Sequence, residues 1–152
     1  MNIQDLIKKK KESYKYFTEK ESLEAIKEDG LALQYVKNQT ENICLEAIKE
    51  DGSALRYVKD QTEDICLEAI KEDGFALRFV NKQTEKICLE AVKKNGDALQ
   101  FVKEQTEDIC LAAVKNESNA LQYVNEDLFK ETKELTVSEI SDLLGYDVKI
   151  IK

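Results

Sequence analysis

Residues 40–61 read TENICLEAIKEDGSALRYVKDQ, and residues 62–83 repeat this string closely as TEDICLEAIKEDGFALRFVNKQ. The pattern begins again at Thr84 and at Thr106, so each copy starts 22 residues after the previous one. A fixed period of about 20 to 50 residues is typical of stacked-repeat proteins, in which each unit contacts mainly its neighbours. The repeat therefore decides the fold class, and folds of this kind usually present surfaces for binding.

Each copy predicts one helical hairpin. In residues 40–61, Thr40 is a suitable N-cap, and Glu41 lies in the first turn, where the helix dipole favours an anion. We expect Gly52 to end the first helix in the left-handed conformation, and a shorter second helix to follow. The apolar residues of the first helix recur at spacings that place them on one face: Ile43, Cys44, Ala47 and Ile48.

The copies together predict an all-α fold, a right-handed α-solenoid of about five short helical hairpins. Isolated helices shorter than about 12–15 residues are marginal in water, so neighbouring hairpins must bury each other's apolar faces. The repeat domain is expected at 18–127, between a basic N-terminal capping helix at 1–17 and a C-terminal helix–strand module at 128–152. The expected units are 18–39, 40–61, 62–83, 84–105 and 106–127.

The composition restricts the classes of function. The chain of 152 residues has a net charge of −8 and contains no His, Pro or Trp. The absence of His removes the commonest general base and metal ligand, and no nucleophile–base pair is recognisable, so we expect no enzyme activity and no cofactor. An acidic chain also makes nucleic acid an unfavourable partner. No apolar stretch suits a signal peptide or a membrane span, so we expect a cytoplasmic protein without a membrane partner.

Three columns of the repeat have both a chemical and a structural interpretation. Equivalent cysteines in stacked hairpins should lie about 8–10 Å apart, too far for a shared zinc ion or a disulfide, so we interpret them as core residues. The aromatic column could stack nucleotide bases, but its period matches the apolar face and favours core packing. The glutamates favour helix-dipole stabilisation and Glu–Lys pairing over acid–base chemistry. The cysteine column consists of Cys44, Cys66, Cys88 and Cys110, and the aromatic column of Tyr35, Tyr57, Phe79, Phe101 and Tyr123. The expected partners of the glutamates are Lys49, Lys71 and Lys93.

The position after each glycine varies most between the copies. Packing does not dictate such a position, so it is free to serve recognition, and Leu31 and Phe75 are candidate anchors. The alternative interpretation is a turn position that tolerates any residue. Arg56 and Arg78 on the second helices are further candidates. The column consists of Leu31, Ser53, Phe75, Asp97 and Asn119.

The predicted strand at 147–152 provides the last candidates, Val148 and Ile150. A lone strand leaves a row of backbone donors and acceptors unpaired. We expect it to add to a partner's sheet or to pair with its own copy, which would make the protein a homodimer.

The string L-E-A-(I/V)-K-x-(D/N)-G-x-A-L-x-(Y/F)-V occurs at Leu45–Val58, Leu67–Val80 and Leu89–Val102. It resembles a tandem-repeat family of unknown function found in bacteria, their phages and large DNA viruses. The tail Leu135–Lys152 is similar to a short module at the ends of assorted phage and bacterial proteins. The resemblance implies helical repeats and assigns no catalytic residues.

From these features we expect a non-enzymatic repeat scaffold that binds another protein. A small, acidic chain rich in Lys, Glu, Ile and Asn suits a phage or prophage of a low-GC bacterium. The expected role is inhibition of a bacterial defence complex, in the manner of an anti-CRISPR protein, by steric occlusion or by acidic mimicry of a phosphate backbone. The alternative is nucleic-acid or nucleotide binding by the aromatic column and the basic N-terminus at Lys8–Lys11.

Overall fold

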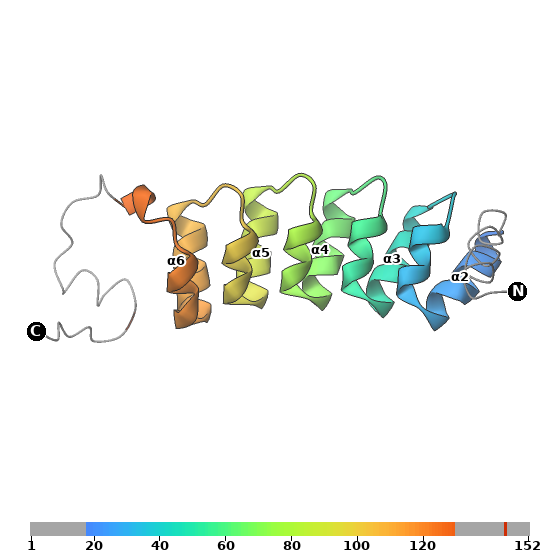
Figure 1. Cartoon of the computed structure of the whole chain (residues 1–152), viewed down its shortest axis with the longest axis horizontal. Coiled ribbons are helices and arrows are strands. Elements are labelled where there is room, and N and C mark those ends of the chain that lie inside the picture. Colours follow the sequence, from blue (N-terminus) through green and yellow to red (C-terminus); the bar gives the residue numbers. More distant parts are fainter. Residues whose placement is uncertain (1–17, 130–144, 146–152) are drawn as a thin grey trace, which may run out of the picture.

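The computed structural model describes residues 18–129 and Gly145, and it shows a row of stacked helical units (Figure 1). Each unit pairs a ten-residue α-helix with a six-residue 3₁₀-helix. The α-helices are α2 (Glu19–Glu28), α3 (Glu41–Glu50), α4 (Glu63–Glu72), α5 (Glu85–Lys94) and α6 (Glu107–Asn116). The 3₁₀-helices are η1 (Gly30–Tyr35), η2 (Gly52–Tyr57), η3 (Gly74–Phe79), η4 (Gly96–Phe101), η5 (Ser118–Tyr123) and the short η6 (Glu126–Phe129).

The units stack in two layers. Each α-helix contacts the α-helix of the next unit, and η1 to η5 contact one another in the same order. We number the units one to five, from α2–η1 to α6–η5. The prediction of repeated helical hairpins is thereby confirmed, and the described residues form helices and connecting turns only. The predicted N-terminal helix at 1–17, and the C-terminal helix and strand within 130–152, lie outside the described residues.

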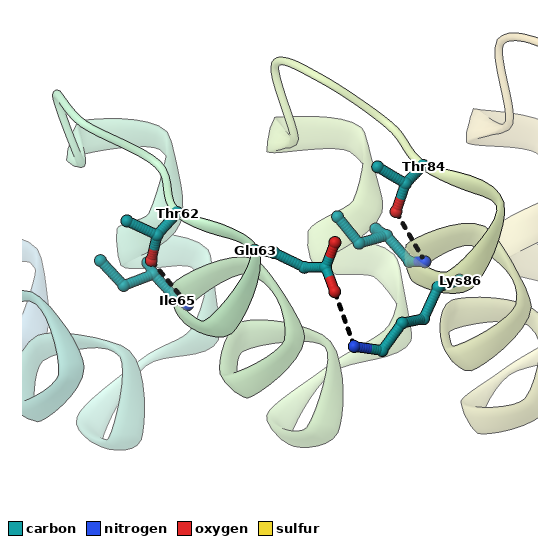
Figure 2. A network of polar contacts seen from close by, with 6 residues as sticks. Thr62, Glu63, Ile65, Thr84 and Lys86 are labelled. Atoms are coloured by element: carbon teal, nitrogen blue, oxygen red, sulfur yellow. Dashed lines mark hydrogen bonds and ion pairs between the residues drawn. The ribbon is translucent and has the colours of Figure 1, made fainter.

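The α-helices begin where the sequence predicts them to begin. The Thr62 hydroxyl accepts a hydrogen bond from the Ile65 N–H at 3.3 Å, and Thr84 caps α5 in the same way through Ile87 (Figure 2). Such a bond satisfies one of the free N–H groups at a helix start. The threonine column is therefore fixed by local structure within each unit.

The prediction that Gly52 adopts the left-handed conformation is wrong. Among the described residues only Gly145 has a positive φ, at 70°. The glycines at the start of the 3₁₀-helices are instead required by the close approach of the next unit. A Cβ atom at Gly30 would lie 2.7 Å from the Ala47 carbonyl oxygen, and one at Gly96 would lie 2.6 Å from the Ala113 carbonyl oxygen.

The core lies between the two layers and runs through the row of units. The α-helices contribute their Ile, Cys and Ala side chains, and the 3₁₀-helices contribute Ala and Leu, with a Val following. The prediction that the cysteines are core residues is confirmed, since all four are buried free thiols. Burial raises the pKa of each thiol, for example at Cys66 and Cys110. The thiols therefore act as small core side chains, and those of Cys66, Cys88 and Cys110 also donate a weak hydrogen bond to a glutamine Oε1.

A glutamine column joins the units, which the sequence did not lead us to expect. Gln61 Nε2 donates to the carbonyl oxygens of Leu55 (3.1 Å) in its own unit and Phe79 (2.9 Å) in the next. Its Oε1 accepts from the Asn81 N–H at 2.9 Å. One amide side chain thus satisfies backbone groups of two units at once. The same link to the next unit is made by Gln39, Gln83 and Gln105.

Candidate functional site

Charge is divided unequally between the two parts of each unit. We call the first part of each unit, which runs from the N-cap threonine through the α-helix to its C-cap residue, the α segment. The second part, which holds the 3₁₀-helix and the loop after it, is the η segment. The α segments hold 19 acidic and 8 basic residues, whereas the η segments hold 5 acidic and 6 basic residues. The acidity of the protein therefore belongs to the α segments. These are 18–29, 40–51, 62–73, 84–95 and 106–117, and the η segments are 30–39, 52–61, 74–83, 96–105 and 118–127.

The ion pairs follow the same division. Four Glu–Lys pairs lie within single α-helices, and three of them are the predicted ones. A further pair at 2.6 Å joins Lys86 of α5 to Glu63 of α4 (Figure 2). By contrast, no cation of the η segments makes an ion pair with another described residue. Lys59 and Lys103 instead donate to backbone carbonyl oxygens of the preceding unit, so the η segments carry positive charge that no described carboxylate pairs. The three predicted pairs are Lys49–Glu46, Lys71–Glu68 and Lys93–Glu90.

The variable column lies at the first turn of the 3₁₀-helices. The backbone N–H of Phe75 donates to the Asp73 carboxylate at 2.9 Å, and that of Ser53 donates to Asp51 at 2.8 Å. Because the residue after the glycine contributes only its backbone N–H to this turn, the turn does not dictate its side chain. Leu31, Ser53, Phe75 and Asp97 are half-buried, and Asn119 is exposed.

Two members of the column pack at the edge of the core. Leu31 and Phe75 both contact buried residues, and each remains partly exposed. The Phe75 ring meets the Phe101 ring edge to face, with centroids 5.8 Å apart. Asp97 keeps one carboxylate oxygen buried without a hydrogen-bond partner among the described residues. The column therefore combines a packing role with partial exposure.

The two arginines lie against the aromatic column. Arg56 Cζ is 5.2 Å from the ring centroids of both Tyr57 and Phe79, and Arg78 Cζ is 4.6 Å from that of Phe79. Arg56 Nε and Nη2 also donate to the carbonyl oxygen and hydroxyl of Ser53. Such stacking holds a guanidinium in a defined position on the surface.

We call this cluster the arginine–aromatic patch. Residues three apart in a 3₁₀-helix lie on the same side of it, so Phe75 is next to Arg78. The guanidinium groups occupy faces of the Tyr57 and Phe79 rings, which leaves less aromatic surface for stacking nucleotide bases. The patch consists of Arg56, Tyr57, Phe75, Arg78 and Phe79.

Three hollows in the described part of the chain are small or open. Two equivalent ones lie between successive loops, with volumes of about 220 Å³ and 290 Å³, and both reach the Thr84 side chain. Ligand pockets commonly enclose about 300–1,000 Å³. A wider hollow of about 650 Å³ over α2 is lined mainly by exposed side chains such as Lys20 and Glu24. The hollows thus resemble gaps between repeats more than an enclosed reaction site.

Within residues 18–129 and Gly145, no three His, Cys, Asp or Glu side chains gather where they could hold a metal ion. No helix in this part of the chain is long and apolar enough to cross a membrane. The remaining sequence candidates, Val148, Ile150 and the basic N-terminus, lie outside the described residues.

Comparison with known proteins identifies the repeat. A family model described as "Domain of unknown function (DUF4116)" matches the chain in four overlapping segments. Successive segments begin 18 to 22 residues apart and together extend over most of the five units. Neither the curated proteins nor the solved structures contain a match to this chain. The matched segments are 22–62, 40–83, 62–106 and 84–129.

Proposed function

We propose that this chain, which belongs to the DUF4116 family, is a non-enzymatic repeat scaffold that binds another protein through its η segments. The observation that carries the proposal is the different charge and ion pairing of the two segments: the α segments hold most of the acidic residues and the ion pairs of the described residues, and the η segments hold the variable column. Five of the eight lysines of the α segments form ion pairs with glutamates of α-helices, whereas no cation of the η segments forms one with a described residue, and the variable column of the η segments is partly exposed. Arginine and aromatic side chains are the commonest energetic centres of protein interfaces.

Nucleic-acid binding by the aromatic column is the less favoured function. The rings are half-buried, and guanidinium groups cover faces of two of them. The net charge of −8 also opposes the approach of a long polyanion.

In its finer form, the proposal concerns the shape and biological setting of the scaffold. The stack is a right-handed solenoid whose first unit is covered by residues 1–17. The strand at 147–152 adds to a partner's sheet or pairs with its own copy. The chain acts in the bacterial cytoplasm as a phage-encoded inhibitor of a defence complex, by occlusion or by acidic mimicry. The composition and the acidic α segments support this setting.

The test is a quantitative pull-down from bacterial lysate with three forms of the full chain. The first is the unaltered protein, and the second is the double variant Leu31→Ser, Phe75→Ser, which places at both positions the residue found in unit two. The third is the control Lys71→Gln, Lys93→Gln, which alters only exposed residues of the α segments. Circular dichroism checks that each variant folds.

We expect the unaltered chain and the control to retain the same protein partners, and the η-segment variant to lose them. The reason is that only the second variant changes the proposed contact surface. Equal retention by all three forms would contradict the assignment to the η segments. If the unaltered protein captures no protein at micromolar concentration, the scaffold function itself is wrong.

A further inference from the structure

The chain contains two arginines, and both occupy the same column of the repeat. Arg56 and Arg78 are the fourth residues after the glycines of units two and three, where the other units have Gln. Gln34 and Gln100 each donate to the carbonyl oxygen three residues before them, which closes the turn. Gln therefore satisfies the local structure at this position, so the fold alone does not require arginine there.

The two guanidinium groups share one aromatic ring. Arg56 Cζ and Arg78 Cζ lie 5.2 Å and 4.6 Å from the Phe79 centroid, which places these two carbons at most about 10 Å apart. Arg56 donates two hydrogen bonds to Ser53, through Nε and Nη2. Arg78 makes no hydrogen bond and no ion pair with any described residue, so no described residue accepts from the N–H groups of its guanidinium.

This arrangement has the chemistry of an anion site. Two like charges repel each other, and an anion between or above them offsets this repulsion by attracting both. A planar guanidinium that is already held by stacking loses little conformational freedom when it binds, and its donors match a carboxylate in a bidentate geometry. Of the eight lysines of the α segments, by contrast, five already have carboxylate partners.

We propose that the arginine–aromatic patch binds an extended acidic segment of the protein partner, with carboxylates on alternate residues and an apolar side chain beside Phe75. This inference rests on the proposed function and specifies the partner's chemistry. Alternate residues of a strand lie about 7 Å apart on one face, which fits two arginines at most about 10 Å apart. A short acidic segment can follow the η segments without meeting the acidic α segments, whereas a long polyanion is repelled by them.

The experiment measures the fluorescence anisotropy of a labelled short peptide of alternating Glu and Thr, titrated with the full chain. A peptide with Gln in place of Glu and a single-stranded oligothymidylate are the comparison probes. The test variant is Arg56→Gln, Arg78→Gln, which places the residue of the other units at both positions. The matched control is Lys71→Gln, Lys93→Gln, which changes the net charge equally but on the α segments.

We expect the acidic peptide to bind the unaltered chain, and the arginine variant to bind it about tenfold more weakly. The control should stay within about twofold, and the Gln peptide should not bind. Raising the salt from about 50 mM to about 300 mM should weaken the complex. Absence of peptide binding, or an equal loss in the arginine variant and the control, overturns the inference. Stronger, arginine-dependent binding of oligothymidylate overturns it in favour of nucleic acid.

The pull-down separates this inference from the function on which it rests. If the arginine variant keeps the partners of the unaltered chain, the scaffold function stands and the acidic-segment inference fails. If the unaltered chain captures no partner, the scaffold function fails whatever the peptide does. Because Gln occupies the column in units one, four and five, we expect the arginine variant to keep the urea midpoint of the unaltered chain.

Discussion

Units four and five share most residues of the repeat, yet they differ in burial or in residue type at several positions that would face a following unit. Leu99 of unit four is completely buried, whereas Leu121, at the same position of unit five, is 65% exposed. Gly96 lies against the carbonyl of Ala113, while unit five has the exposed Ser118 at the glycine position. In the described residues, only the short η6 follows unit five. The burial of a repeat position therefore depends on the neighbouring unit as well as on its own hairpin.

The turn before the 3₁₀-helix shows the same difference. The Asn95 side chain accepts from the Asp97 N–H at 2.9 Å. Glu117, the equivalent residue of unit five, makes no side-chain cap of η5. Where the next unit does not demand a tight turn, the capping residue changes as well. This comparison predicts that the same substitution has unequal effects in the two units.

The largest difference is expected for the leucine column. Leu99→Ala removes a buried side chain and leaves a cavity between units, so it should lower the free energy of unfolding by about 2–5 kcal/mol. Leu121→Ala removes a mostly exposed side chain and should cost about 0.5 kcal/mol or less. Urea unfolding followed by circular dichroism measures both. Equal costs would mean that Leu121 is covered in solution.

The glycine column comes next. Gly96→Ala introduces a Cβ atom 2.6 Å from the Ala113 carbonyl oxygen and 2.8 Å from Glu117 Cβ, so units four and five must move apart. Such overpacking should cost about 1–3 kcal/mol in the same urea experiment. Ser118→Ala is the matched control, with an expected change of about 0.5 kcal/mol or less. A neutral Gly96→Ala would show that the close approach does not explain the glycine.

The sequence predicted the features of this fold that depend on local interactions. Thr62 and Ile65 could be placed because helix capping and apolar spacing involve residues only a few positions apart. The role of Gly52 was mistaken because it depends on where the next unit lies, which no local rule contains. The patch was found only in part. Arg56 and Arg78 could be named as candidates, but their shared contact with Phe79 joins two units in space.

The glutamine column tests how strongly the units are joined. Gln83 Nε2 donates to the Phe101 carbonyl oxygen at 2.9 Å, and its Oε1 accepts from the Lys103 N–H at 2.9 Å. Gln83→Ala leaves these backbone groups of unit four without partners, so we expect a loss of about 1–2 kcal/mol in urea unfolding. Gln100→Ala removes only a local, exposed hydrogen bond and should change stability by about 0.5 kcal/mol or less. If both variants lose the same stability, the link between units contributes nothing measurable.

The smallest expected difference concerns the cysteines, which are buried in both units. Burial raises the pKa of the thiols of Cys88 and Cys110, so little reactive thiolate forms in the native protein and alkylation requires an opening of the stack. Unit five is packed against fewer units than unit four, so it should open at a lower free energy. We expect all four thiols to react far more slowly with N-ethylmaleimide than in the urea-unfolded chain. Mass spectrometry of the tryptic peptides should show Cys110 labelled before Cys88. Equal rates at both sites would mean that the stack opens as one cooperative unit, and that the end of the row is no weaker than its middle.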